Sequence, residues 1–252
     1  MKAVIITIGN EILKGRTVNT NFSFIGKLLT FSGYNVSLGI IVPDNLDAIA
    51  AAFRNAAAYG DLIISSGGLG PTYDDMTLTG FARAFNLNLK LNETAFNMIK
   101  NKFDKITPER EKMAIIPEGS IPLKNDAGTA PGVYMEIDNK KYIILPGVPR
   151  EVESIMNNFI EKIRIKNYVY LDESFTVNGI MESSLAPYIK NLMKDYGDMV
   201  YIKTHPKGNE IKSPVLEIEV SASGNDKNMV QETIKNVINM IKRDIDILQD
   251  KH

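Results

Sequence analysis

The stretch Asp61-Leu62-Ile63-Ile64-Ser65-Ser66-Gly67-Gly68-Leu69-Gly70-Pro71-Thr72-Tyr73-Asp74-Asp75-Met76-Thr77 decides the fold prediction for this chain. Residues 61–64 form a short, mostly apolar run with β-branched side chains, which is typical of a buried strand. Glycines follow at once, at the point where a parallel strand would pass into a helix. Because open α/β sheets bind their ligands at this edge, the stretch predicts both an α/β fold and the position of a site.

The same stretch predicts a phosphate and metal site. Glycines adopt positive φ and let a phosphate approach backbone amides, and Thr72 and Thr77 add hydroxyl donors. Asp74 and Asp75 would repel a bare phosphate, so a divalent cation is expected between the carboxylates and the phosphate oxygens. The alternative is a tight turn in which one of the two aspartates only caps the next helix.

Two other glycine motifs do not fit the stretch. It lacks the Lys-Ser/Thr ending of a P-loop, and Tyr73 stands where a dinucleotide fingerprint that begins at Gly68 needs its last glycine. Mononucleotide kinases and ordinary dehydrogenases are therefore not supported.

The composition is that of a soluble globular protein. The chain has 252 residues, of which 44% are hydrophobic and 23% are charged. A net charge of -1 and the lack of a long basic run argue against nucleic acid and anionic membranes as partners. Residues 3–8 are too short to span a membrane and no signal cleavage site follows them, so the expected location is the cytoplasm.

Two residue types limit the chemistry. The chain has no cysteine, which excludes disulfides, thiolate metal sites and a cysteine nucleophile. Its histidines are His205 and His252, so any metal should be a hard ion with oxygen ligands rather than a histidine-bound zinc. We interpret His205 as part of a solvated turn rather than as a catalytic group.

Alternating strands and helices up to residue 165 predict a parallel sheet with helices on both faces. The expected strands are 2–8, 35–42, 61–64, 133–137 and 141–145, and the expected helices are 19–32, 46 to about 60, 78–85, 93–102, 108–114 and 150–165. Residues 133–145 form a predicted hairpin that is added to the sheet.

The rest of the chain predicts a separate small α+β domain with a β-α-β-β-α pattern. Its expected elements are strand 175–177, helix 182–195, strands 199–204 and 215–221, and helix 227–242. We place the boundary so that the domains are 1–168 and 169–252.

Polar segments at other predicted strand ends supply further candidates. Glu11 is a candidate metal ligand, and Asn19 and Asn21 are candidates for binding an anion or ribose hydroxyls. The alternative makes the asparagines helix caps and Glu11 a solvated charge. Asp44 either caps the following helix or reaches the metal, and capping is favoured.

Two later loops have the glycine and proline content of ligand-binding turns. Residues 125–132 contain small side chains that allow close backbone approach to a ligand, although a plain surface loop fits equally well. Residues 145–151 place a rigid turn before a helix, where Arg150 either pairs with a phosphate or stays exposed in the first turn.

Together these segments resemble the amino-terminal domain of the CinA (competence/damage-inducible protein A) family, within the wider group of MoaB/MogA-like molybdopterin-binding domains. The matching segments are Gly9-Asn10-Glu11-Ile12-Leu13-Lys14-Gly15, Asn19-Thr20-Asn21, residues 67–77, Gly128-Thr129-Ala130-Pro131-Gly132 and Leu145-Pro146-Gly147-Val148-Pro149. The resemblance covers residues 1–165 and implies a three-layer α/β/α domain with a mostly parallel sheet. Residues 169–252 are similar in pattern to the middle domain of such proteins.

The chain departs from the family at three points. Asn10 stands where the family often has an aspartate, and Ser66 replaces a usual threonine but keeps the hydroxyl. Full-length relatives continue into a nicotinamide mononucleotide deamidase domain, and this chain ends at His252. We therefore expect the deamidase activity to be absent.

The resemblance implies a metal-dependent pyrophosphatase that hydrolyses ADP-ribose, or a related nucleoside diphosphate sugar, to AMP and a sugar phosphate. Magnesium is the expected metal, a monovalent cation is allowed beside it, and the expected assembly is a homodimer. Two alternatives stay open: molybdopterin binding or adenylylation in molybdenum cofactor biosynthesis, and a nucleotide-binding module without turnover. The pairing of residues 69–72 with residues 146–149 favours the nucleotide substrate.

The expected site contains two groups of residues. Asp75, Asp74 and Glu11 are expected to hold the metal and to be catalytic, and the resemblance ranks Asp75 above Asp74. The expected substrate-binding residues are Gly67, Gly68, Leu69, Gly70, Thr72, Thr77, Asn19, Asn21, Gly128, Thr129, Ala130, Gly132, Pro146 and Gly147.

Overall fold

The computed structural model describes residues 1–207 and 213–250. The chain divides into two compact units, residues 1–30 with 34–164, and residues 31–33 with 165–252. The domain boundary after residue 168 stays a prediction.

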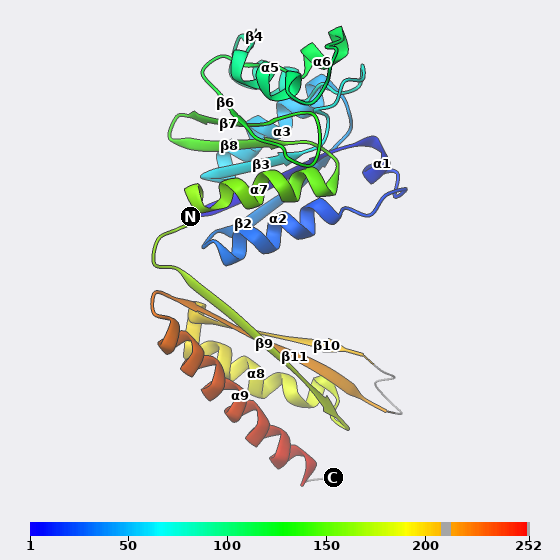
Figure 1. The fold of residues 1–252 in the computed structure, drawn as a ribbon. Coiled ribbons are helices and arrows are strands. Elements are labelled where there is room, and N and C mark those ends of the chain that lie inside the picture. Colours follow the sequence, from blue (N-terminus) through cyan, green and yellow to red (C-terminus); the bar gives the residue numbers. More distant parts are fainter. Residues whose placement is uncertain (208–212, 251–252) are drawn as a thin grey trace. The chain divides into compact units, whose positions relative to one another are not determined.

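The first unit is built on a six-stranded sheet with the order β2-β1-β3-β8-β7-β6 (Figure 1). The strands are β1 Lys2–Ile8, β2 Asn35–Val42, β3 Leu62–Ser66, β6 Ile121–Leu123, β7 Gly132–Ile137 and β8 Lys140–Leu145. Two further strands, β4 Leu89–Leu91 and β5 Ile115–Pro117, pair with each other.

The sheet is parallel where the site lies. Strand β1 pairs in parallel with β2 and β3, and β3 pairs in parallel with β8. The β8–β7 and β7–β6 pairs are antiparallel. The predicted mostly parallel sheet is confirmed. Asp138 and Asn139 both have positive φ at the turn of the predicted hairpin, as a two-residue hairpin loop requires.

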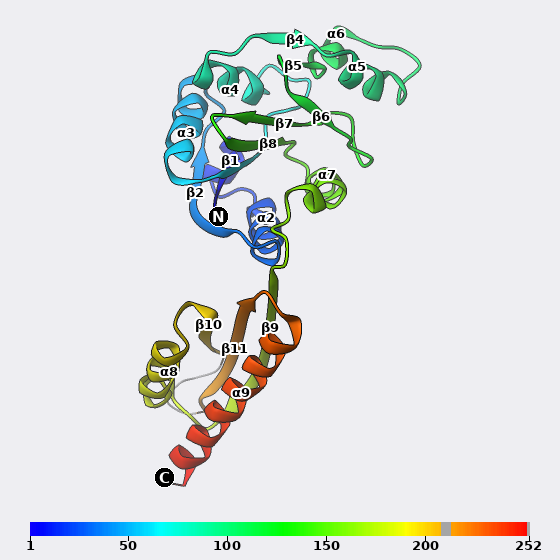
Figure 2. The ribbon, with the colours of Figure 1, turned by 90° about the vertical axis from the view of Figure 1, so that its left-hand side faces the viewer.

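Helices cover both faces of this sheet, as predicted. The helices of the unit are α1 Asn10–Leu13, α2 Thr20–Phe31, α3 Leu46–Tyr59, α4 Thr77–Phe85, α5 Glu93–Lys100, α6 Pro108–Lys112 and α7 Pro149–Ile163. Figure 2 shows α3 and α4 on one face and α2 and α7 on the other. Both faces of β3 are therefore buried, which explains its apolar run Leu62-Ile63-Ile64.

Aromatic rings fill the core between the sheet and the α3–α4 pair. Phe81 is fully buried, and its ring centroid lies 4.9 Å from that of Phe53 and 5.2 Å from those of Phe85 and Tyr142. The rings meet at steep angles, the arrangement that aromatic quadrupoles prefer. This core fixes α4, and therefore the chain that leads into it from the glycine stretch.

The short elements of the first unit were not predicted from the sequence. The structure adds helix α1 and strands β4, β5 and β6, each only three or four residues long. Such segments are too short to show a hydrophobic period, and their pairing partners are distant in sequence. Three predicted helix ends also moved by two residues each, to Lys100, Lys112 and Ile163.

Asn45, rather than Asp44, is the residue that caps α3. Its side-chain oxygen accepts hydrogen bonds from the amides of Asp47, at 3.0 Å, and Ala48, at 3.1 Å. Asp44 accepts instead from the Asn10 amide at the start of α1, at 2.9 Å. The favoured capping role of Asp44 is thus corrected, because the following residue has the extended backbone and the amides within reach.

Removing this cap should cost a measurable part of the stability. We expect Asn45→Ala to lower the free energy of unfolding by about 1 kcal/mol, since two helix amides lose their partner. Urea unfolding followed by circular dichroism measures this value. Asn55→Ala, at an exposed position inside the same helix, serves as the control and should be neutral or slightly stabilising.

The second unit is the predicted small α+β domain. It contains β9 Val169–Asn178, α8 Glu182–Tyr196, β10 Val200–Pro206, β11 Val215–Gly224 and α9 Lys227–Gln249, with a short 3-10 turn at Gly197–Met199. The antiparallel sheet has the order β10-β11-β9. Alternate residues of β10 and β11 pack with α8 and α9 in one core.

Three predictions in this unit were wrong. The helix expected to end at residue 242 continues to Gln249 as α9. The strand expected at 175–177 is ten residues long, because all of β9 pairs with β11. Its exposed side chains are polar, so the sequence pattern did not indicate the full strand. His205 lies in β10 rather than in a turn, with Nε2 3.3 Å from Oε2 of Glu219 on β11. Across residues 1–207 and 213–250, none of the helices combines the length and the apolar character needed to cross a membrane.

Candidate functional site

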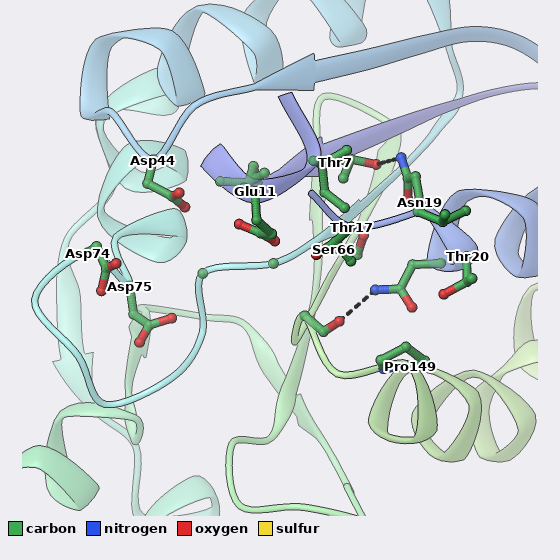
Figure 3. A pocket seen from close by; sticks show the side chains of 18 of the residues that line it. Thr7, Glu11, Thr17, Asn19, Thr20, Asp44, Ser66, Asp74, Asp75 and Pro149 are labelled. Atoms are coloured by element: carbon green, nitrogen blue, oxygen red, sulfur yellow. Dashed lines mark hydrogen bonds between the residues drawn. The ribbon is translucent and has the colours of Figure 1, made fainter. Parts of the chain in front are cut away.

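A cavity of about 230 Å³ lies at the carboxyl ends of β1 and β3, the edge that the sequence predicted (Figure 3). Five chain segments, 7–12, 17–21, 66–75, 147–149 and Asp44, contribute to its wall. Its lining residues are Thr7, Ile8, Gly9, Glu11, Ile12, Thr17, Val18, Asn19, Thr20, Asn21, Asp44, Ser66, Gly67, Gly68, Thr72, Asp74, Asp75, Gly147 and Pro149.

The glycines at the mouth of β3 are required by the packing of the chain itself. Gly67 and Gly68 have φ values of 109° and 68°, a region that side chains disfavour. A Cβ on Gly67 would lie 2.1 Å from the Ile8 carbonyl oxygen, and one on Gly68 would lie 2.3 Å from Oγ1 of Thr77. These contacts account for both glycines before any phosphate is considered.

Thr77 lies outside the cavity and holds the glycine turn in place. Its side chain is fully buried, and its hydroxyl donates to the Gly67 carbonyl at 2.8 Å. Its amide donates to the Gly68 carbonyl at 3.1 Å. Thr77 was predicted to bind substrate, and the structure instead commits its hydroxyl to the backbone of the loop.

Thr72, Asp74 and Asp75 form a compact polar cluster at the cavity wall. The Thr72 amide donates to the Asp75 carboxylate at 2.8 Å, and the Thr72 hydroxyl lies within hydrogen-bond distance of both carboxylates. A hydroxyl has one proton to donate, so one carboxylate is left with free acceptor capacity. The N-cap of α4 is Met76, so neither aspartate plays the capping role of the alternative interpretation.

The Thr72 hydroxyl holds the pKa of Asp74 below its usual value, with smaller help from a backbone hydrogen bond and Lys112. Lys112 also fixes the loop from behind, since its ammonium donates to the carbonyl oxygens of Thr72 and Asp75. Asp74 is therefore ionised at neutral pH, at the wall of the cavity.

This interaction can be tested by titration. We expect Thr72→Val to raise the pKa of Asp74 toward the ordinary aspartate value, because the largest stabiliser of the charged form is removed. Carboxyl ¹³C NMR measures the shift, and Thr72→Ser, which keeps the hydroxyl, is the control. The lowered pKa stabilises the fold above the unfolded-state pKa, and this contribution disappears as the pH falls through the folded-state pKa. An unchanged Asp74 pKa in Thr72→Val would contradict the assignment.

Glu11 and Asp44 also line the cavity, but the carboxylates are not gathered into one cage. The Glu11 carboxylate folds back over Gly9, where an added Cβ would lie 2.5 Å from its Oε1. Within the described part of the chain, no group of three or more Asp, Glu, His or Cys side chains is placed to hold a metal ion. The predicted trio of Asp74, Asp75 and Glu11 shares a cavity without forming a preformed three-carboxylate site.

Asn19 and Asn21 line the cavity and also hold its wall together. The Asn19 side chain accepts from the Phe22 amide at 3.1 Å and donates to the Thr7 hydroxyl at 3.0 Å. The Asn21 amide donates to the Gly147 carbonyl at 2.7 Å, which ties the start of α2 to the loop before α7. Asn19 therefore does cap the helix, as the alternative interpretation had it.

A second compartment of about 660 Å³ adjoins the cavity, and the two share Glu11, Thr17, Gly68, Asp75, Gly147 and Pro149. Its wall holds the predicted residues Leu69, Gly70, Thr129, Ala130 and Pro146. It also holds Phe103, Arg110 and Met113, which the sequence did not indicate. The Arg110 guanidinium stacks over the Phe103 ring, 3.7 Å from its centroid.

Three other predicted residues lie outside both compartments. A Cβ on Gly128 would collide with the Glu151 carboxylate, so this glycine is needed by its neighbour. Gly132 opens β7 and packs against Ile155. Arg150 is exposed and lines neither compartment. The loop before Gly132 is organised by buried Asn125, whose side chain accepts from the amides of residues 127 and 128.

Sequence reasoning also missed several lining residues. Thr7 and Ser66 are the ends of strands β1 and β3, and their inclusion follows once the two strands are known to be neighbours. Thr17 follows α1 in a loop with no recognisable pattern. Phe103 and Arg110 come from an excursion between α5 and α6 whose path the sequence does not predict.

Comparison with known proteins identifies the family to which the chain that forms this cavity belongs. Residues 4–165 match the family model for a probable molybdopterin binding domain. The chain belongs to this molybdopterin-binding family. All residues that line the two compartments fall inside the matched range.

Relatives of known sequence share nearly the whole chain. A protein from Caldivirga maquilingensis is 49% identical over 245 residues, covering 96% of this chain and 95% of its own length. A protein from Thermoplasma volcanium is 50% identical over 242 residues, covering 95% of this chain and 94% of its own. Their names describe no activity.

A solved structure supports the resemblance to CinA. The crystal structure of the protein CinA with unknown function from Thermoplasma acidophilum is 52% identical and superposes with a TM-score of 0.64. It covers 66% of this chain and 100% of its own. Membership of the molybdopterin-binding family favours the alternative prediction, molybdopterin binding. These findings offer no support for ADP-ribose pyrophosphatase activity.

Proposed function

We propose that the first unit binds a molybdopterin-type ligand, a pterin that carries a phosphate group, in the cavity at the ends of β1 and β3. The observation that carries this proposal is that the family match, residues 4–165, contains all of the lining residues. The position of the cavity supports the proposal, because helix amino ends favour anionic groups and parallel sheets bind ligands at the carboxyl ends of their strands.

A divalent cation fits the acidic side of this cavity. Magnesium in proteins is commonly held by one or two carboxylates, with ligand phosphate and water oxygens completing the shell. Asp74 and Asp75 supply such a pair, and the lowered pKa keeps Asp74 charged. Two carboxylates are sufficient for this mode of binding, so a three-carboxylate cage is not required.

The second compartment offers space for a planar ring. Phe103 and Arg110 present a stacked pair, and Met113 and Leu69 add apolar surface. A pterin is flat and polar at its edges, so it suits contact with a guanidinium plane and apolar side chains. The shared wall at Gly68 and Gly147 lets one ligand extend across both compartments.

A second candidate is hydrolysis of ADP-ribose to AMP and ribose 5-phosphate. The observation that favours phosphoanhydride chemistry is the pair of carboxylates, Asp74 and Asp75, at the mouth of the glycine turn. A bound magnesium ion would neutralise phosphate charge and activate water there. Asp75 would hold the ion, and the Thr72 amide and hydroxyl keep its carboxylate in position.

One set of incubations separates these functions. Purified protein is titrated by calorimetry with molybdopterin and, separately, with ADP-ribose, each with and without magnesium. Products are followed by mass spectrometry, with ATP added to one molybdopterin sample. Binding of molybdopterin without cleavage of ADP-ribose is the expected result, and an adenylylated pterin would extend it to catalysis.

Other outcomes would change the assignment. Release of AMP from ADP-ribose would establish the second candidate. Tight nucleotide binding with no product would indicate a binding module without turnover. If neither molybdopterin nor ADP-ribose binds, the proposed function is wrong.

A further inference from the structure

Ser66 carries a buried hydroxyl that lacks a hydrogen-bond partner within the described ranges, 1–207 and 213–250. The residue is 1% exposed, at the last position of β3. A buried hydroxyl without a partner costs free energy, on the order of 1–3 kcal/mol. Native proteins rarely retain such a group unless something else, such as a ligand, completes its hydrogen bond.

The position of Ser66 points to a ligand rather than to a packing accident. Ser66 lies between Thr7 of β1 and Leu145 of β8, and it lines the cavity. The neighbouring Thr7 hydroxyl accepts a hydrogen bond from the Asn19 side-chain amide and keeps its own proton to donate. Among the residues that line the cavity, Ser66 is the one whose hydroxyl is buried and has neither a donor nor an acceptor partner in the described chain.

Ser65 provides an internal comparison. Its hydroxyl is also buried without a partner in the described chain, and it is 0% exposed. Successive strand residues point to opposite faces of a sheet, and Ser65 is not among the cavity-lining residues. The two serines thus share chemistry and burial but differ in their access to the cavity.

The surroundings of Ser66 suit an anion. Figure 3 shows Asp44, Asp74 and Asp75 together, Ser66, Thr17 and Thr20 apart from them, and Glu11 between the two groups. The first turn of the twelve-residue helix α2 lies with the hydroxyl-bearing group and brings the positive end of its dipole. The part of the cavity near α2 is therefore rich in donors, and the three aspartates lie away from it.

We propose that the Ser66 hydroxyl donates a hydrogen bond to a phosphate group of the bound ligand, beside the amino end of α2. The phosphate would then lie away from Asp74 and Asp75, so the repulsion from these two carboxylates is reduced. A serine reaches the cavity by a change of one side-chain dihedral. This inference rests on the proposed function for placing the ligand in this cavity, and it assigns Ser66 a role of its own.

The test compares Ser66→Ala and Ser65→Ala with the unchanged protein. Binding of inorganic phosphate, in magnesium-containing buffer, is measured by ³¹P NMR titration, and stability is measured by urea unfolding. We expect Ser66→Ala to raise the Kd for phosphate by at least about tenfold, since it removes a hydrogen bond to a charged group. Ser65→Ala should leave phosphate binding unchanged. Both variants should be as stable as the unchanged protein, or more stable, because each removes an unpaired buried hydroxyl.

Three results would overturn the inference. They are unchanged phosphate binding in Ser66→Ala, no phosphate binding by the unchanged protein, or a loss of stability in Ser66→Ala that Ser65→Ala does not show. Repeating the titration with molybdopterin separates the two proposals. If phosphate binding depends on Ser66 but molybdopterin does not bind, the proposed ligand is wrong and the inference stands. If molybdopterin binds both Ser66→Ala and the unchanged protein equally, the inference is wrong and the ligand stands.

Discussion

Gly67→Ala is expected to lower the free energy of unfolding by about 2 to 5 kcal/mol, the largest loss of stability among the variants considered. The new methyl group would lie 2.1 Å from the Ile8 carbonyl oxygen, at the junction of β1 and β3. Overpacking of this kind costs about 1–3 kcal/mol, and a left-handed backbone at a residue with a Cβ adds about 1–2 kcal/mol. Both costs apply, because φ at Gly67 is 109°.

Gly119→Ala is the matched control for this variant. Gly119 also has positive φ, 83°, but a Cβ there would have no neighbour within 4 Å. It should cost only about 1 kcal/mol, which isolates the backbone contribution. Urea unfolding of both variants gives the difference. Equal losses would show that the contact with Ile8 is not the reason for glycine at position 67.

Asp75→Asn is expected to weaken magnesium-dependent ligand binding by at least about a hundredfold. Residues that contact a bound metal only through its ligands already change the metal affinity by about 10–100-fold when they are mutated. Loss of a carboxylate that binds the metal itself should therefore have an effect at least as large. An asparagine keeps the oxygen that accepts from the Thr72 amide, so the loop should stay folded. Calorimetric titration with molybdopterin, with and without magnesium, measures the change.

Asp104→Asn controls for the loss of one negative charge. Asp104 is exposed in the same unit and lines neither compartment. Its substitution should leave binding within about twofold of the unchanged protein, since distant exposed charges are screened. If Asp75→Asn binds with full affinity in magnesium, then Asp75 does not hold the ion. A parallel loss without magnesium would show that Asp75 acts on the ligand directly.

Local patterns were sufficient for most of the long elements of the fold, but not for β9, whose ten residues were predicted as three. The run that became β3 is apolar because both faces of the strand are buried, and that signal is present in its own residues. The helix expected to begin at residue 108 does begin at Pro108 as α6, and the Thr107 hydroxyl caps it by accepting from the Arg110 amide. Strands β4, β5 and β6 were missed, since three residues carry too little pattern and depend on partners elsewhere in the chain.

The candidate site was predicted less evenly. Asp74, Asp75 and Thr72 were identified because their residue types and spacing limit their chemistry, and all three line the cavity. Thr77 was also predicted to bind substrate, but its side chain is buried and its hydroxyl donates to the Gly67 carbonyl. Whether a polar side chain faces a cavity or its own backbone is a matter of orientation, which residue type alone does not specify.

From its residues alone, the chain determined a parallel α/β unit and the strand end at which the cavity lies. Buried apolar runs and glycines that tolerate positive φ are local properties, and they can be recognised without knowing the fold. Only the tertiary structure decided which polar groups face the cavity. Asn21 and Gly147 are 126 residues apart and are joined by a hydrogen bond, and the lack of a partner at Ser66 depends on every neighbouring strand. Such contacts join distant parts of the chain, so they exist only once the sheet has assembled.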